Sequence, residues 1–328
     1  MKKKRIISTI LTIFAVVAFF FVVTFEYFSA GINNSTVLFS VLAADRNTNT
    51  ITTSSDQFKI LQITDTQFNN YILAGLSLPL AKRAILKAKP DMIVLTGDNT
   101  HNDSTKREYD LLVRFLDSFG IPWAAVLGNH EYSTALSFED LCNALSGGEH
   151  SLFQEGTIAN SYGNYYYNVK KDDNIVFSLF FMDSAQDGFR AEHVAWYENA
   201  VNSITAENGG TVVPSFAFFH IPTIETQYAY DAYKLDSSIG SGEVHEEICY
   251  QSTNVGFFDK VVELGSTKAL IYGHDHVNNM IVDWQGVKLC YGLKTGRTIY
   301  YRSGMLGGNL YTVNADGTFG IERIYVYL

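Results

Sequence analysis

The feature that most constrains the fold of this chain is a set of five apolar runs of strand length. Each run is followed directly by side chains that can bind metal ions. The polar groups that follow the five runs are Asp65-Thr66-Gln67, Gly97-Asp98-Asn99, Gly128-Asn129-His130-Glu131, His220-Ile221-Pro222 and Gly273-His274-Asp275-His276. Ligand sites of open α/β sheets lie at the C-terminal ends of the strands, so we expect these groups to meet. One Asp or Asn after a strand is an ordinary turn residue, but five sets behind five strands are hard to explain as turns.

The apolar runs alternate with longer amphipathic segments, which is typical of an α/β domain. The pattern predicts strands at 58–64, 91–96, 123–127, 165–169, 174–182, 213–219 and 269–272. It predicts helices around 77–89, 105–119, 191–206 and 256–264, and short β segments at 280–283, 287–291, 310–314 and 319–327. The length of 328 residues allows one or two domains. No Pro-rich or Gly-rich linker follows residue 58, which favours a single domain over 58–328.

The N-terminus has the composition of a membrane-targeting segment. Four cations, Lys2 to Arg5, precede an uncharged apolar run from Ile6 to Phe25 that is close to the length needed to span a bilayer. Residues 1–44 are therefore expected to be either a signal peptide, cleaved near Ala43 or Ala44, or an uncleaved signal anchor. Residues 45–57 are polar and predict a linker. We expect the body to be exported, either extracellular or anchored to the membrane and facing outside.

Charge and cysteine content restrict the partners. The chain carries 24 Lys and Arg against 34 Asp and Glu, a net charge of −10, so nucleic acid is not an expected partner. The three cysteines, Cys142, Cys249 and Cys290, are too few for a disulfide scaffold, and one bridge would leave a free thiol.

His274 and His276 are the most informative pair. Side chains two residues apart in an extended segment point to the same side, so both imidazoles can converge on one cavity. Two converging imidazoles indicate a metal site.

The order and spacing of these blocks resemble the calcineurin-like metallophosphoesterase superfamily, and the phrases around them are similar to its purple-acid-phosphatase-related branch. The superfamily pattern is D-x-H, G-D, G-N-H-D/E, a lone His and G-H-x-H. The resemblance implies a four-layer α/β/β/α sandwich. It also implies a hydrolase with two metal ions, Mn, Fe or Zn, whose bound hydroxide attacks small phosphate esters. With the N-terminal segment, we expect this hydrolase to be extracytoplasmic. Phosphomonoesters are favoured over diesters.

The resemblance also implies roles for single residues. Asp98 would bridge the two metals, with Asp65 and His276 on the first. The second metal would be held by Asn129, His220 and His274. His130 would donate a hydrogen bond to the phosphoryl oxygen or protonate the leaving alcohol. Asn129 and His130 would also contact the substrate. Independently of the resemblance, Arg297 is a candidate for binding the phosphate, because it is a cation in the segment that follows the histidine pair; the alternative is a solvated charge in a β loop.

Gln67 departs from the pattern, because the superfamily has His at this position. Its amide oxygen would be a weaker, neutral metal ligand. His101, three residues after Asp98, would either replace the missing imidazole or orient His130; the third alternative is an exposed loop histidine. The competing function is therefore a degenerate, non-catalytic metal- or phosphate-binding protein on the same scaffold.

The other polar residues near these blocks are expected to be structural. Glu131 would support the site rather than react. The histidines at 150, 193 and 245 have no partner at ligand spacing and are expected at the surface.

Overall fold

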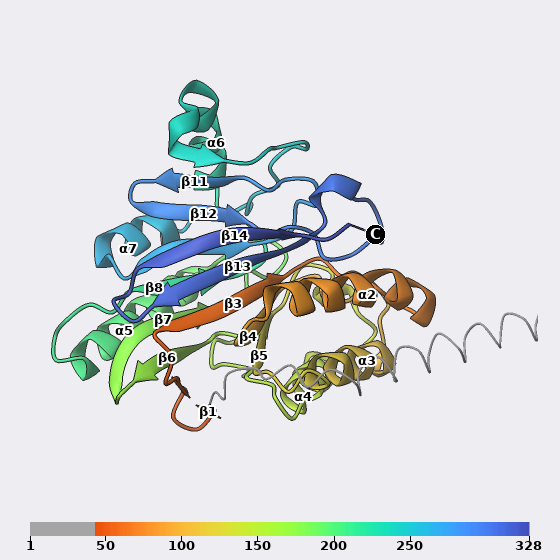
Figure 1. Ribbon diagram of the computed structural model, residues 1–328, viewed down its shortest axis with the longest axis horizontal. Helices are drawn as coiled ribbons and strands as arrows, with labels where there is room; N and C mark the ends of the chain where they lie inside the picture. Colours follow the sequence, from red (N-terminus) through yellow and green to blue (C-terminus); the bar gives the residue numbers. More distant parts are fainter. Residues whose placement is uncertain (1–42, 328) are drawn as a thin grey trace, which may run out of the picture. The chain divides into compact units, whose positions relative to one another are not determined.

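The computed structural model describes residues 43–327, which form two β-sheets flanked by helices (Figure 1). The larger sheet has the strand order β1-β2-β6-β7-β8-β10-β12-β11-β9, and the smaller has the order β14-β13-β3-β4-β5. The strands are β1 (Ala43–Asp45), β2 (Thr50–Thr52), β3 (Gln57–Ile63), β4 (Met92–Thr96), β5 (Trp123–Val126), β6 (Tyr165–Lys171), β7 (Asn174–Phe181), β8 (Ser215–Phe218), β9 (Gly240–Ser241), β10 (Thr267–Tyr272), β11 (Ile281–Trp284), β12 (Val287–Tyr291), β13 (Gly307–Asn314) and β14 (Phe319–Tyr325).

Six α-helices and three short 3₁₀ helices complete the described part of the chain. They are α2 (Tyr71–Ala88), α3 (Lys106–Asp117), α4 (Phe138–Ser146), α5 (Ala191–Glu207), α6 (Glu225–Leu235), α7 (Phe257–Leu264), η1 (Glu131–Ser133), η2 (Ser237–Ile239) and η3 (Ser303–Met305). The α/β class expected from the sequence is confirmed.

The sheets contact each other through aromatic side chains. Strand β8 alternates its side chains between two faces, as every strand does. Phe216 and Phe218 contact the ring of Tyr311 on β13, with ring centroids 5.6 and 6.4 Å apart. Ala217 points the other way, into a buried cluster that includes Tyr197 of α5. One face of the larger sheet therefore packs on the smaller sheet, and the other packs on helices.

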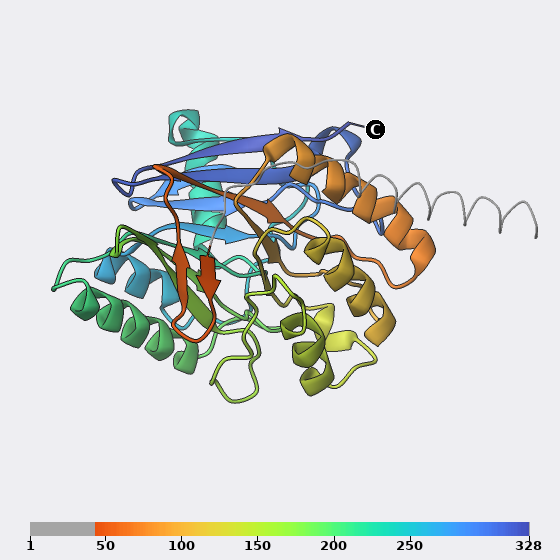
Figure 2. The same ribbon diagram turned by 60° about the horizontal axis from the view of Figure 1, so that its bottom comes forward.

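Helices cover the outer faces of both sheets. Figure 2 shows α5 and α7 side by side below the larger sheet, where their apolar side chains join the same buried cluster. Helix α2 packs against β13, β14 and β3 of the smaller sheet. A capping box formed by Thr105 and Glu108 starts α3, which packs on α4.

The N-terminal expectations are tested only in part. Residues 1–42, the bulk of the expected targeting segment, lie outside the described residues. The expected linker 45–57 is not wholly a linker, because Thr50–Thr52 forms β2 and pairs in parallel with β6. Ile51 is the reason, since this apolar residue is fully buried. Between residues 43 and 327, no helix combines the length and the apolar character needed to cross a bilayer.

The topology brings the predicted ligand blocks to one region. Strands β3, β4 and β5 are neighbours and run parallel, so their C-terminal ends lie at one edge of the smaller sheet. Strands β8 and β10 are parallel neighbours in the larger sheet. Since the two sheets pack face to face, the five loops that follow these strands can meet between them.

Candidate metal centre

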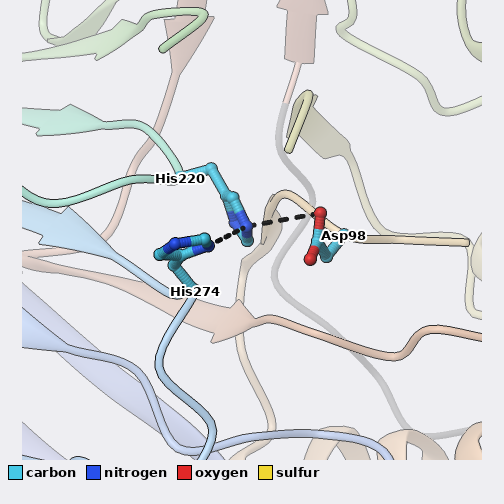
Figure 3. A group of neighbouring side chains, drawn as sticks. All are labelled: Asp98, His220 and His274. Carbon is cyan, nitrogen blue, oxygen red and sulfur yellow. Dashed lines mark hydrogen bonds and ion pairs between the residues drawn. The ribbon is translucent and has the colours of Figure 1, made fainter. Parts of the chain in front are cut away.

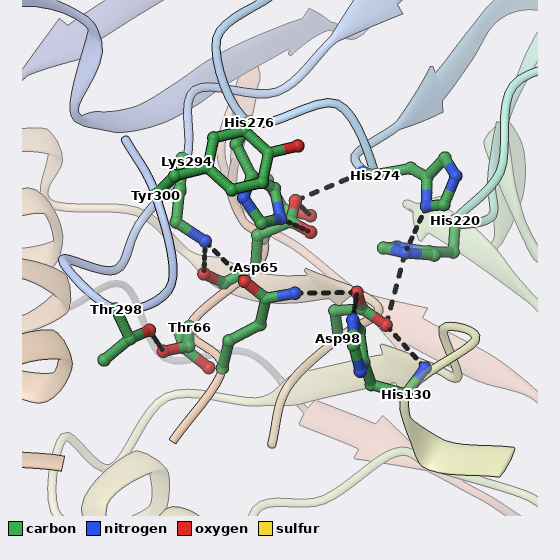
Figure 4. A network of polar contacts seen from close by, with 12 residues as sticks. Asp65, Thr66, Asp98, His130, His220, His274, His276, Lys294, Thr298 and Tyr300 are labelled. Carbon is green, nitrogen blue, oxygen red and sulfur yellow. Dashed lines mark hydrogen bonds and ion pairs between the residues drawn. The ribbon is translucent and has the colours of Figure 1, made fainter. Parts of the chain in front are cut away.

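The loops after β3, β4, β5, β8 and β10 converge on one cluster of polar side chains (Figure 4). Asp65, Gln67, Asp98 and His274 all have positive φ angles, between 41° and 79°. Residues other than glycine adopt this conformation at a cost, and such strain gathers at functional sites. The tight backbone turns point their side chains into the same space.

One ligand group consists of Asp98, His220 and His274, with ligand atoms within 4.8 Å of one another (Figure 3). His220 Nε2 lies 3.3 Å from Asp98 Oδ1 and 3.3 Å from His274 Nδ1. His220 Nδ1 donates to the backbone oxygen of Thr96 at 2.8 Å, which leaves Nε2 to face the group. A hydrogen bond of this kind is what orients metal-binding imidazoles in proteins.

A buried oxygen next to this group has no partner. Asn129 Oδ1 accepts no hydrogen bond, although burial of an unpaired amide oxygen is costly. Asn129 lines the same cavity as His274. A carboxylate, two imidazole nitrogens and a free amide oxygen form a donor set that fits a divalent metal ion.

The second ligand group shares Asp98 and adds Asp65 and His276. Asp65 Oδ1 lies 3.5 Å from His276 Nε2 and accepts no hydrogen bond. Asp65 Oδ2 accepts from the Thr64 hydroxyl at 2.8 Å and from the His274 amide at 3.2 Å. These contacts hold the carboxylate so that Oδ1 faces the cluster.

The pKa values of the cluster are shifted because carboxylates and imidazoles are buried next to one another. Burial opposes ionisation of Asp65, but the nearby His276 imidazole and the His220 charge lower its pKa. Burial also opposes ionisation of Asp98, yet His220 lowers its pKa. Despite burial, Asp98 raises the pKa of His220 to about 10, whereas burial and His220 lower the pKa of His274 to about 4. Without metal, His220 is therefore the imidazolium that balances the carboxylates.

Both ends of the Gln67 amide make hydrogen bonds. Its Nε2 donates to Asp98 Oδ2 at 3.0 Å, and its Oε1 accepts from Lys294 Nζ at 2.7 Å. The oxygen that was expected to bind metal thus already accepts a hydrogen bond from a buried cation. Burial lowers the pKa of Lys294 to about 8, although Asp65 and Asp98 oppose the shift.

Lys294, not Arg297, is the cation that the C-terminal segment brings to the cluster. Lys294 forms an isolated parallel bridge with Thr64, the residue before Asp65. Arg297 Nε is buried without a hydrogen-bond partner, and within residues 43–327 no hydrogen bond or ion pair links Arg297 to the cluster. The expectation that Arg297 binds substrate thus has no supporting contact.

His130 borders both the cluster and a cavity. Its Nε2 lies 3.6 Å from Asp98 Oδ2, its backbone N–H donates to Asp98 Oδ1, and Nδ1 lies 2.6 Å from Asn102 Oδ1. The cavity has a volume of about 370 Å³, and its lining includes His130, His274 and Asn129.

His101 lies against His130 rather than within either ligand group. The two imidazole rings stack with centroids 4.5 Å apart and an interplanar angle of 28°. Burial lowers the pKa of His101, and the neighbouring His130 lowers it further. Of the alternatives for His101, this geometry favours orientation of His130 over metal ligation.

Glu131 ties the loops together. Its buried carboxylate accepts from the backbone N–H groups of Gly128 and Asp98 through Oε2, and from Asn99 and Thr100 through Oε1, at 2.7–3.1 Å. Burial and the charge of Asp98 raise the pKa of Glu131 to about 8. The structural role expected for Glu131 agrees with these contacts.

The three remaining histidines differ in exposure. His245 is exposed and pairs with Glu243, and His150 is half-buried. His193 is fully buried, so its expected surface position is wrong. Its Nδ1 accepts from the Arg190 N–H at the start of α5, and Nε2 lies 2.8 Å from Ser161 Oγ. These bonds satisfy the imidazole inside the core.

The family comparisons agree with the motif order. Residues 58–278 match the family model described as "Calcineurin-like phosphoesterase". "Probable inactive purple acid phosphatase 29" of Arabidopsis thaliana is 27% identical, over 76% of this chain and 74% of that protein. "Phosphatase DCR2" of Saccharomyces cerevisiae is 25% identical, over 62% of this chain and 39% of that protein.

The fold also resembles a solved structure. A dimetal phosphatase from Danio rerio superposes with a TM-score of 0.52 at 14% sequence identity, over 81% of this chain and 99% of that one. This likeness concerns the fold alone. The matched family model, together with the purple acid phosphatase relatives, shows that the chain belongs to the calcineurin-like phosphoesterase family, in a branch related to the purple acid phosphatases.

Proposed function

We propose that the protein is an extracytoplasmic, metal-dependent phosphoesterase that hydrolyses small phosphate esters, with phosphomonoesters favoured. One observation carries the proposal: the donor atoms of Asp98, His220 and His274 converge at the wall of a cavity, beside the unpartnered oxygen of Asn129. Membership of the phosphoesterase family supports the reaction class. Two sheets packed face to face, with helices outside, support the four-layer α/β/β/α sandwich expected from the sequence.

A metal held by Asp98, Asn129, His220 and His274 would supply Lewis-acid stabilisation of the phosphoryl charge and a water of lowered pKa. Side chains of the protein would position the substrate and transfer the proton. With Nδ1–H donated to Asn102, His130 presents Nε2 beside Asp98 at the cavity wall. From there it can bind a phosphoryl oxygen or pass a proton to the leaving alcohol. Stacking on His101 restricts the tilt of this ring.

The lining of the cavity bears on the substrate. No carboxylate, ammonium or guanidinium group is among its lining side chains, which are Asn102, Asn129, His130, Ser133, Gln186, Ile221, Tyr250, Gln251, Ser252 and His274. The phosphoryl charge would therefore be met by the metal and His130, while amides and hydroxyls contact the remainder of a small substrate. A highly charged polymer would find no Lys or Arg among these lining residues.

The test is hydrolysis by purified protein. Metal-stripped protein reloaded with Mn²⁺, Zn²⁺ or Fe should release p-nitrophenol from p-nitrophenyl phosphate faster than from bis(p-nitrophenyl) phosphate. Asp98→Asn and His130→Ala should each lower kcat by at least about 100-fold. His245→Ala, which changes an exposed histidine, is the matched control and should retain the wild-type rate. Absence of turnover with every metal between pH 5 and 9 would refute the enzyme.

A second function, non-catalytic binding of metal or phosphate, is favoured by two observations. Gln67 stands where the family pattern has His, and its amide oxygen accepts from Lys294. Three relatives also carry the words "Probable inactive" in their names. This function predicts Mn²⁺ and phosphate binding by calorimetry, with no turnover of either ester.

A further inference from the structure

Lys294 lies on the side of the metal centre that contains Asp65, Gln67 and His276. Its side chain is buried, with 1% exposure, and its backbone pairs beside Thr64. Nζ donates to the backbone oxygen of Asp65 at 2.9 Å and to Gln67 Oε1 at 2.7 Å. The ammonium group therefore contacts two of the residues expected at the first metal.

This contact fixes the orientation of the Gln67 amide. Lysine is a donor only, so the amide oxygen must face Nζ and the NH₂ group must face away. The NH₂ group then donates to Asp98 Oδ2 at 3.0 Å. Rotating the amide to free its oxygen would set NH₂ against the ammonium and an oxygen against the carboxylate. Lys294, Gln67 and Asp98 thus form a chain in which each donor has its acceptor.

The two halves of the centre differ as a result. On the side of His220 and His274, Asp98 Oδ1 lies 3.3 Å from His220 Nε2, which lies 3.3 Å from His274 Nδ1, and Asn129 Oδ1 has no partner. Asp98 Oδ1 also accepts the His130 backbone N–H at 3.0 Å. On the other side, Gln67 Oε1 accepts a hydrogen bond from Lys294, and Asp98 Oδ2 accepts one from Gln67. This leaves Asp65 Oδ1 and the His276 imidazole as the metal-binding groups that accept no hydrogen bond. Only the side of His220 and His274 offers four metal-binding atoms, which come from Asp98, Asn129, His220 and His274.

The charge of Lys294 also opposes binding of a metal ion on the side of Gln67. A metal on Gln67 Oε1 would lie within about 5 Å of the ammonium, given ordinary metal–oxygen distances of about 2.1 Å. Like charges at that separation repel strongly in a buried site. Asp65 and Asp98 supply two negative charges, which one divalent ion and Lys294 already outweigh.

We propose that the centre binds one metal ion, at Asp98, Asn129, His220 and His274, and that the Lys294 ammonium, held by Gln67, takes the place of the second ion. The inference rests on the proposed function for the identity of the site. It assigns Gln67 as the residue that holds Lys294 and donates to Asp98, and not as a metal ligand.

The test is metal stoichiometry of the purified protein. After loading with Mn²⁺ and dialysis, elemental analysis should give one Mn per chain, and electron paramagnetic resonance should show an isolated, uncoupled Mn²⁺ ion. His274→Ala should lose this ion. The double variant Gln67→His/Lys294→Met restores the family imidazole and removes the ammonium, so it should bind a second Mn²⁺ at least about 100-fold more tightly than wild type and give an exchange-coupled spectrum.

The outcomes separate this inference from the proposed function. Lys106→Met removes an exposed ammonium on α3 and should still bind one Mn²⁺. Two tightly bound ions in wild type would overturn the inference, whether or not the protein hydrolyses esters. So would a folded double variant that still binds one. If circular dichroism shows that the double variant does not fold, the number of Mn²⁺ ions bound by the wild type tests the inference: one ion supports it and two overturn it. One ion without turnover would instead refute the proposed function and leave the single-metal assignment standing.

Discussion

Glu131→Gln should destabilise the protein although it is nearly isosteric, because the carboxylate accepts four backbone N–H groups. Each of its two oxygens accepts two of these bonds. Glutamine keeps one oxygen and replaces the other by NH₂, so two buried N–H groups would lose their acceptor and face a donor. At about 1–3 kcal/mol for each unsatisfied group, the penalty is about 2–6 kcal/mol.

One effect opposes this loss. Burial and the charge of Asp98 raise the pKa of Glu131 to about 8, so ionising this side chain is costly, and the neutral glutamine avoids that cost. We therefore expect the free energy of unfolding to fall by about 3 kcal/mol.

Urea unfolding, followed by tryptophan fluorescence, measures this change as a lower midpoint at an unaltered slope. The matched control is Glu322→Gln on β14, where the side chain is exposed and a change within about 0.5 kcal/mol is expected. A loss below about 1 kcal/mol for Glu131→Gln would show that the carboxylate does not hold the loops together.

Three further predictions concern pH, metal affinity and packing. Burial lowers the pKa of His193 to about 4 from 6.5, so the unfolded chain binds more protons between these values. Stability should therefore fall by about 3 kcal/mol as the pH drops from 6.5 to 4, and thermal unfolding of His193→Gln should show a weaker pH dependence. The pKa of His220 is about 10 without metal, after the charge of Asp98 overcomes burial, so Mn²⁺ must displace a proton. Its affinity, measured by calorimetry, should rise about tenfold per unit between pH 6 and 8, and a flat profile would contradict this. In Gly128→Ala the new Cβ would overlap the Asp98 carboxylate and backbone nitrogen. This variant should lose about 1–3 kcal/mol and bind Mn²⁺ weakly, whereas Gly75→Ala, in open space on α2, should not destabilise.

Strong local patterns predicted most of the fold. The apolar run at β4 is fully buried, and its expected end, Thr96, matches the structure. Helix α2 begins at Tyr71, six residues before the expected start, because the Asn70 side chain caps it by accepting from the Leu73 N–H. Helices α4 and α6 and the 3₁₀ turns were not expected.

The convergence of the candidate ligands was predictable, because these residues follow strands whose ends meet. The Lys294 contact was not, because Lys294 lies 227 residues from Gln67 and only the fold brings them together. Gln67 at a position where the family pattern has His was the one local sign of it. His193 shows the same limit, since its burial depends on Ser161 and the start of α5.

Crystals grown with Mn²⁺ and inorganic phosphate would test the central claim most directly, through anomalous diffraction at the manganese edge. We expect one anomalous peak, bounded by Asp98, Asn129, His220 and His274, with a phosphate oxygen within hydrogen-bond distance of His130. No peak at this position, or phosphate bound away from His130, would contradict it.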